Sequence, residues 1–160
     1  PIRIRDRVQD EIENNIVLYF TNFTRNSSDV LEEQVKKMAD NNTTSLLSLH
    51  ALVEQAKLIK DCLIRGNIDE LGEILDYGFQ QKKLLAKGIS TPEIELLYKT
   101  ALKAGATGGK ISGAGGGGFM FFYCPNNTKY DVINALDKLK MGYHQPFTWN
   151  KFGMRTWQIG

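Results

Sequence analysis

The sequence predicts an α+β domain in which helices pack on a small, antiparallel-rich sheet. Helical apolar periodicity fills most of residues 27–105, whereas short β-branched or aromatic runs lie before and after this region. The last third of the chain is typical of a strand, a helix and two further strands, a β-α-β-β tail. A chain of 160 residues, of which 42% are hydrophobic, is long enough for one domain with its own core.

The amino-terminal residues favour strands. Residues 2–5 alternate isoleucine and arginine, like a strand entered in mid-chain, and the β-branched and aromatic run at 16–23 predicts another strand. Because the first residue is proline and not methionine, we expect a fragment of something longer.

Four helices are expected next, each with a periodic apolar face and a start or stop signal. Ser27, Ser28 and Asp29 are N-cap candidates for the first, and Pro92 is well placed in the first turn of the last. The second is expected to turn Leu49, Val53, Ala56, Ile59 and Leu63 inward. The four expected ranges are 27–42, 43–65, 68–87 and 91–104.

The carboxy-terminal third is expected to contain strands and one helix. Five consecutive apolar residues at 119–123 predict a strand buried on both faces. Apolar spacing over 132–139 predicts a helix, and two short strands are expected near 146–150 and 155–159.

Composition excludes several function classes. Twenty Lys and Arg residues against 18 Asp and Glu leave a net charge of +2, too balanced to suggest a nucleic-acid partner. No apolar run approaches the ~20 residues that span a bilayer, so we expect no membrane partner, and no signal peptide is visible. Cys62 and Cys124 are expected to be buried small apolar residues of a cytoplasmic protein. His50 is expected to be packed or half-exposed, and His144 to lie in a turn.

Glycine is concentrated in one segment. Eight of the 15 glycines lie between Gly105 and Gly118, although each costs roughly 0.5–1 kcal/mol inside an element. Glycine permits positive φ and lets backbone N–H groups approach a ligand, and successive N–H groups can form a concave anion site. We therefore expect a loop that faces phosphate or substrate. A flexible linker or a close-packed helix-to-strand crossing is the structural alternative.

Two familiar phosphate motifs do not explain this segment. Gly113, Gly115 and Gly118 satisfy the spacing G-x-G-x-x-G, but that fingerprint follows a strand and opens a helix, whereas here a helix is expected before the loop and a strand after it. The phosphate-loop pattern fails because Ala104 and Ile111 occupy two of its required positions.

Residues 110–118, Lys-Ile-Ser-Gly-Ala-Gly-Gly-Gly-Gly, resemble the third glycine-rich motif of the GHMP kinases, which phosphorylate galactose, homoserine, mevalonate and phosphomevalonate. Ser112 replaces the threonine of many members and keeps the hydroxyl. Residues 18–29 and 88–92 resemble the sugar-kinase branch that acts on D-glycero-D-manno-heptose 7-phosphate. The resemblance covers essentially the whole chain, but only the C-terminal part of such an enzyme.

The resemblance implies a fold, a reaction and partners. It implies a GHMP kinase C-terminal domain with a ferredoxin-like tail at 26–160, preceded at 1–25 by the final strands of a truncated N-terminal kinase domain. The enzyme would use ATP and Mg²⁺ to phosphorylate a sugar hydroxyl, the anomeric one of a heptose 7-phosphate. The ATP loop and the catalytic base are expected in the missing N-terminal domain, so this fragment should be inactive alone. Whether the protein forms a homodimer is left open by the resemblance.

Eight residues are the expected substrate- and phosphate-binding set, and no metal ligand is assigned. Arg25 could hold a sugar phosphate together with helix N–H groups, or it could be a surface arginine paired with Asp29. Lys110 could face phosphate or solvent. A Cβ at Gly113 or Gly115 is expected to push into the phosphate site. The set is Gly109, Lys110, Ser112, Gly113, Ala114, Gly115, Gly116 and Arg25.

Two functional alternatives stay open at this point. The glycine loop could belong to a non-catalytic module that binds a phosphorylated metabolite. The chain could also be a helical interaction domain in which the glycine loop is incidental.

Overall fold

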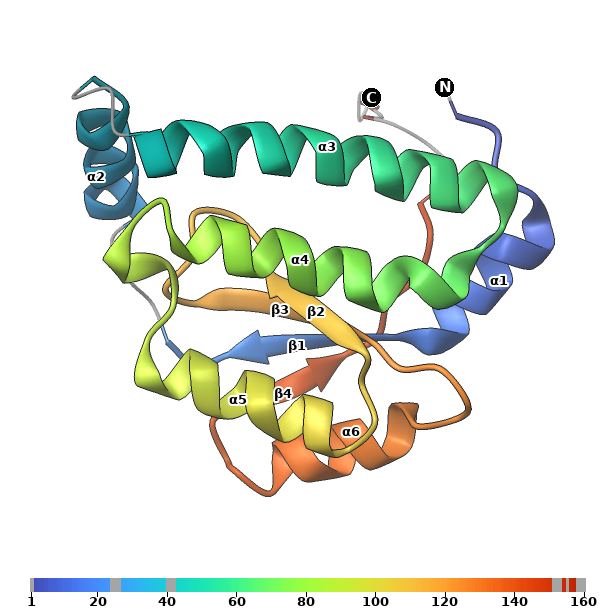
Figure 1. Ribbon diagram of the computed structural model, residues 1–160. Helices are drawn as coiled ribbons and strands as arrows, with labels where there is room; N and C mark the ends of the chain where they lie inside the picture. Colours follow the sequence, from blue (N-terminus) through green and yellow to red (C-terminus); the bar gives the residue numbers. More distant parts are fainter. Residues whose placement is uncertain (1, 24–26, 40–42, 151–153, 155, 158–160) are drawn as a thin grey trace.

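A computed structural model of the chain (Figure 1) describes residues 2–23, 27–39, 43–150, 154, 156 and 157. Four strands form one sheet in the order β2-β3-β1-β4, and every neighbouring pair is antiparallel. The strands are β1 (Ile16–Thr21), β2 (Gly108–Ile111), β3 (Gly118–Tyr123) and β4 (Gly142–Gln145). The helices are α1 (Asp6–Asn15), α2 (Ser27–Ala39), α3 (Thr43–Arg65), α4 (Leu71–Lys83), α5 (Pro92–Lys103), α6 (Lys129–Asp137) and the 3₁₀ turns η1 (Ile68–Glu70) and η2 (Lys87–Ile89). The expected α+β class is confirmed.

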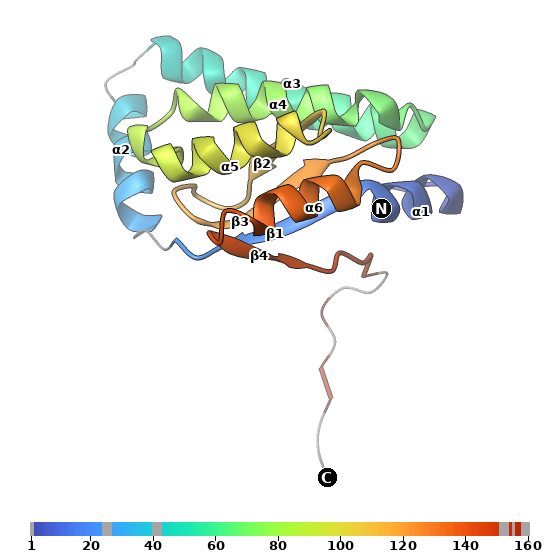
Figure 2. The same cartoon turned by 90° about the horizontal axis from the view of Figure 1, so that it is seen from below.

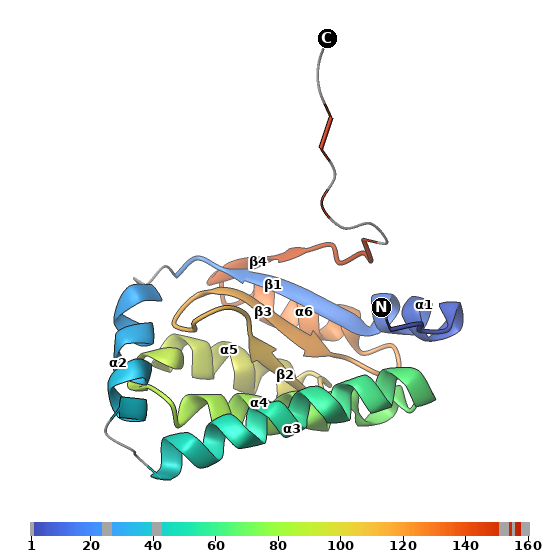
Figure 3. The ribbon, with the colours of Figure 1, turned by 90° about the horizontal axis from the view of Figure 1, so that it is seen from above.

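The helices are placed unevenly around the sheet. Helices α5 and α6 lie side by side against one face (Figure 2), and α6 contacts β1 and β4. Helix α4 packs along the edge strand β2, and α3 lies outside α4 (Figure 3). The edge strand β2 is therefore covered by a helix, as buried sheet edges require.

Alternation along β1 divides the core into two clusters. Val17 and Tyr19 are buried in the larger cluster with residues of α5 and α6 such as Leu97 and Leu136. Ile16 belongs to a second cluster with residues of α1 and α4. Strand β1 lies between β3 and β4, so both faces of the sheet depend on it. The domain boundary expected at residue 25 stays a prediction.

Expectations for the two ends of the chain were wrong in part. Residues 2–5 form no strand, and α1, which the sequence analysis missed, follows them. Only Val8 and Ile12 of α1 are buried, so its periodic signal is too short to stand out. Near the other end, the strand lies at Gly142–Gln145 instead of 146–150, and it contains His144, which is therefore not a turn residue. The strand expected at 155–159 falls partly outside the described residues.

The third expected helix is shorter than predicted, because it begins as η1 and α4 ends at Lys83. The faces of two other elements also differ. Strand β3 is not buried on both faces: Phe119 is 36% exposed, and its ring contacts Phe20 at 4.9 Å between centroids. On α3, Val53 is 55% exposed.

The buried face of α3 is partly polar. Ser45, Ser48 and Gln55 are buried there, and Gln55 Nε2 donates a hydrogen bond to Ile74 O on α4 at 2.9 Å. Apolar periodicity identified the inward face of α3 only in part, because Leu49, Ile59 and Leu63 pack against the core whereas Val53 and Ala56 are exposed. The helices α2 and α5 and the helix expected over 132–139 are confirmed, the last as α6.

Candidate functional site

Part of the glycine-rich segment is strand and not loop. Gly108–Ile111 form β2, which the sequence analysis placed inside the loop, and Ile111 pairs with Met120 of β3. The Ser112 N–H donates to Phe119 O at 2.7 Å and closes the hairpin. Residues 112–117, here called the glycine loop, therefore connect two antiparallel strands.

Three separated segments meet at the glycine loop, and they are the segments that carried the resemblance. The Gly116 N–H donates to Ile89 O of η2 at 2.9 Å. At the end of the loop, the Gly118 N–H donates to Phe23 O at 3.3 Å, and Gly118 O accepts from Thr21 Oγ1 at 3.0 Å. The loop is thus fixed by β1 and its extension on one side and by η2 on another.

The tip of the loop is open. Gly113 is exposed and has φ +70°, and nothing lies within 4 Å of the position that a Cβ would take. Gly115 is different, because its Cβ would lie 2.8 Å from Ile89 Cα. A Cβ at Gly115 would therefore press on η2, so the expectation that it points into a phosphate site was wrong.

Backbone donors remain available at the tip. Within the part of the chain that the structure describes, no backbone carbonyl accepts from the N–H groups of Gly113, Ala114 or Gly117. Unpaired N–H groups on a turn of positive φ are suited to bind an anion.

Two lysines from different elements lie beside the loop. Lys82, in the last turn of α4, donates a hydrogen bond from Nζ to Gly113 O. Burial and the nearby charge of Lys110 lower the pKa of Lys82 to about 8. Burial also lowers the pKa of Lys110, which comes from β2. Sequence reasoning missed Lys82, because a lysine at a helix end has no signal that separates it from a solvated one.

A buried tyrosine on α5 connects strand β2 to helix α4. The Tyr98 hydroxyl of α5 donates to Asp76 Oδ1 of α4 at 2.6 Å, and Gly109 O lies 3.4 Å from the same hydroxyl. Burial and the Asp76 carboxylate raise the pKa of Tyr98 well above its usual range. The link joins α4, α5 and β2 and so fixes the strand that leads into the loop.

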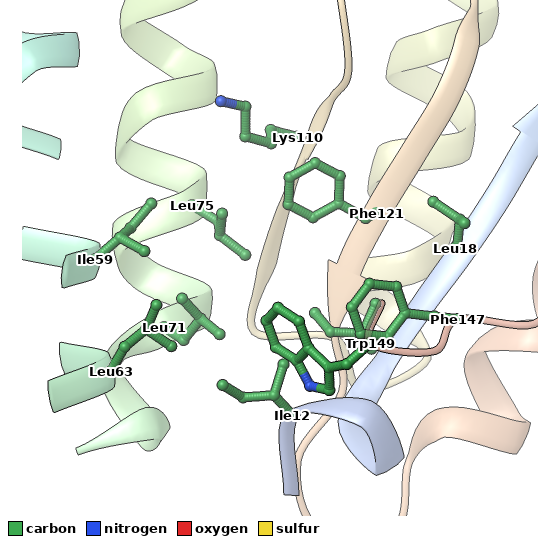
Figure 4. Close-up of a pocket in the computed structure, with 11 residues that line it drawn as sticks. Ile12, Leu18, Ile59, Leu63, Leu71, Leu75, Lys110, Phe121, Phe147 and Trp149 are labelled. Carbon is green, nitrogen blue, oxygen red and sulfur yellow. The ribbon is translucent and has the colours of Figure 1, made fainter. Parts of the chain in front are cut away.

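Lys110 also borders an apolar pocket on the sheet face that α5 and α6 leave free (Figure 4). Its aliphatic stem lines the pocket, and its nitrogen points toward α4. Phe147 and Trp149 close the far side, where Trp149 Nε1 donates to Gln9 O at 2.9 Å. The pocket walls are apolar, so a phosphate group would have to lie at the Lys110 end.

The predicted site residues divide by position. Gly109 and Lys110 lie in β2, whereas Ser112, Gly113, Ala114, Gly115 and Gly116 lie in the glycine loop. Arg25 lies outside the described residues. The binding roles of all eight residues stay predictions. Cys62 and Cys124 are buried, as expected, whereas His50 is exposed.

The described residues contain no group of three or more His, Cys, Asp or Glu side chains that could hold a metal ion. Of the helices in the described ranges, none is long and apolar enough to cross a membrane.

Comparisons with known proteins agree with this geometry. Residues 58–142 match the family model "GHMP kinases C terminal". The chain is 40% identical over 159 residues to the D-glycero-alpha-D-manno-heptose 7-phosphate kinase of Campylobacter jejuni, covering 99% of this chain and 46% of that kinase. The chain thus spans less than half the length of this relative.

Solved structures show the same fold. A Campylobacter jejuni protein with a sugar-kinase assignment superposes with a TM-score of 0.68 at 38% identity, over 99% of this chain and 43% of that one. A D-glycero-D-manno-heptose 1-phosphate kinase from Bacteroides thetaiotaomicron gives a TM-score of 0.62 at 25% identity, over 96% and 41%. The family match covers more than half of the chain and contains the whole glycine loop, so this chain belongs to the GHMP kinase family, in its C-terminal part.

Proposed function

We propose that this chain is the C-terminal domain of a cytoplasmic, ATP-dependent sugar kinase. The reaction transfers the γ-phosphoryl group of ATP to a sugar hydroxyl, and the acceptor is the anomeric hydroxyl of a heptose 7-phosphate. The observation that carries the proposal is the 40% identity to a heptose 7-phosphate kinase, which extends over 99% of this chain.

The glycine loop offers backbone hydrogen-bond donors in a fixed position, and phosphoryl transfer requires such donors. Such transfer depends on positioning and charge stabilisation more than on covalent chemistry. Backbone N–H groups at Gly113 and Ala114 can bind phosphate oxygens without moving, because Thr21, Phe23 and Ile89 already fix the loop. The loop therefore orients and stabilises charge, and the proton acceptor for the sugar hydroxyl is assigned to the other domain.

The described residues do not fit a magnesium site of their own. They contain no group of three or more His, Cys, Asp or Glu side chains that could hold a metal ion, and the charged side chains Lys82 and Lys110 beside the loop are cationic. We therefore assign the Mg²⁺ ligands to the other domain and to the ATP phosphates.

The acceptor is tested with the complete protein that contains this chain. Phosphoryl transfer from ATP should be efficient with D-glycero-D-manno-heptose 7-phosphate and weak with the unphosphorylated heptose and with galactose. Equal use of the phosphorylated and the free sugar would refute the heptose-phosphate assignment. The 160-residue chain alone should show no transfer above the buffer background.

A second test addresses Arg25. If its guanidinium binds the sugar phosphate, Arg25→Ala in the complete protein should raise KM for the sugar phosphate about 10- to 150-fold and leave KM for ATP unchanged. Arg7→Ala, which removes an exposed arginine of α1, is the matched control. An unchanged KM in Arg25→Ala would remove Arg25 from the site. Tight sugar-phosphate binding with no transfer would favour the non-catalytic module.

A further inference from the structure

Lys82 and Lys110 are two half-buried cations, and neither has an acidic partner among the described residues. Among the described residues, no carboxylate oxygen lies within 4.0 Å of either ammonium group. The charged group that acts on Lys82 is another lysine, Lys110. The structure therefore places two like charges together, partly out of water, beside the glycine loop.

The adjacent lysine, Lys83, differs from Lys82 because it is paired with an acidic side chain. Lys83 Nζ lies 3.0 Å from Glu95 Oε1 and 5.0 Å from the centre of the Phe79 ring. Lys37 on α2 is likewise paired with Glu33 at 3.0 Å. Lys82 and Lys83 are neighbours in the last turn of α4, yet among the described residues only Lys83 of the two has a counter-charge.

Half-buried ammonium groups without a counter-charge are costly unless a bound anion compensates them. An ammonium group has three donors, and Lys82 uses one of them on Gly113 O. Within the described residues, no carboxylate pairs with Lys82 or Lys110, and no backbone carbonyl accepts from the N–H groups of Gly113 or Ala114. Cationic and neutral donors beside one loop match a group with several anionic oxygens.

We propose that Lys82 of α4 is a further phosphoryl-binding residue of the glycine-loop site, where its charge acts together with that of Lys110 from β2. Lys82 has two functions there: it orients the loop through Gly113 O, and it contributes a charge to the bound group. This inference rests on the proposed function for the source of the phosphoryl group, which is either the nucleotide or the sugar phosphate.

The site itself is tested without catalysis. The ¹⁵N,¹³C-labelled chain is titrated with inorganic phosphate and with pyrophosphate while the amide signals of Gly113 and Ala114 and the side-chain signal of Lys82 are followed by NMR. Binding should shift all three signals and raise the pKa of Lys82 by about one unit, because an adjacent anion favours the charged amine. Unchanged loop signals at saturating pyrophosphate would overturn the proposal.

Variants separate a specific site from general charge attraction. Lys82→Met should weaken pyrophosphate binding at least about tenfold, whereas Lys83→Met, the matched control, should stay within about twofold of wild type. Lys82→Arg keeps the charge and should recover part of the affinity. Equal losses in Lys82→Met and Lys83→Met, or no loss in Lys82→Met, would overturn the site. The amide spectrum of each variant reports directly that it is folded.

The complete protein then identifies the source of the phosphoryl group. If Lys82→Met raises KM for ATP, the site holds a nucleotide phosphate; if it raises KM for the heptose phosphate, the site holds the acceptor. Both results support the site, and an unchanged KM for both substrates contradicts it. A complete protein without sugar-kinase activity would refute the proposed function and leave the NMR titration as an independent result.

Discussion

Four glycines in and beside the glycine loop form two groups that look alike in sequence but have different surroundings. A Cβ on Gly108 would lie 1.9 Å from Gly72 O, and one on Gly115 would lie 2.8 Å from Ile89 Cα. A Cβ on Gly113 or Gly118 would meet nothing within 4 Å. The first group lets backbones approach each other, whereas the second keeps a positive φ and open space beside the loop.

The difference teaches that a glycine-rich motif combines support with function. Packed glycines bring β2 against α4 and the loop against η2, and these contacts hold the open tip in place. A substitution at either group can abolish activity, but for different physical reasons. Measurements of stability and of activity on the same variants separate the two groups.

Gly108→Ala should have the largest effect on stability. The new methyl group would overlap a backbone carbonyl oxygen of α4, which cannot move without shifting the helix. We expect a loss of about 3 kcal/mol in the free energy of unfolding, measured by denaturant titration. Gly113→Ala is the control, and a similar loss in both variants would contradict the division into packed and open glycines.

Gly115→Ala should have the next largest effect. The variant combines a contact with the backbone of Ile89 and a φ of +114° that is unfavourable for alanine. A loss of about 2 kcal/mol is expected from crowding and backbone strain together. Hydrogen exchange should show faster exchange at the Gly116 amide, because its bond to Ile89 O would be disturbed. A variant that is as stable as wild type would show that η2 adapts to the methyl group.

Gly113→Ala should affect function more than stability. Its only structural cost is the left-handed backbone conformation, about 1 kcal/mol. In the complete protein, kcat/KM should fall roughly tenfold or more, because the methyl group changes the geometry of the backbone donors at the tip. Thermal denaturation of the same sample provides the comparison. Normal activity in this variant would place the bound phosphate away from Gly113.

Much of the fold could be predicted because its signals are local. The cap residue Thr91 and Pro92 mark the start of α5, and Thr91 Oγ1 does accept from the Ile94 N–H. The α+β class could be predicted because a long helical region is flanked by strand-like runs. Helix α1 and strand β2 were missed because α1 buries only two residues and half of β2 is glycine. Glycine indicates a loop in sequence, and here pairing with β3 overrides that preference.

The candidate site could be predicted only along one segment. The glycine motif is continuous in sequence, so its residues were found together. Lys82 lies 31 residues before Gly113 and meets it only through the packing of α4 on β2. Which glycines are packed depends in the same way on Ile89 and Gly72, which the motif does not contain.

The smallest expected effect concerns Lys82 and the pH dependence of stability. Its pKa is about 8 in the folded chain and about 10.4 when unfolded, so between these values the unfolded chain binds more protons. Stability therefore rises with pH over this interval. Relative to Lys82→Met, the wild-type chain should gain about 1 kcal/mol between pH 7.5 and pH 10, once solvent screening is allowed for.

Denaturant titrations of both chains across this pH range measure the difference. Lys110→Met sharpens the test, because the charge of Lys110 is one cause of the lowered pKa and its removal should reduce the gain. A difference between wild type and Lys82→Met that stays flat or falls with pH would mean that Lys82 is solvated like an ordinary surface lysine. In that case the backbone donors at the loop tip would remain, but Lys82 would not add an uncompensated charge beside them.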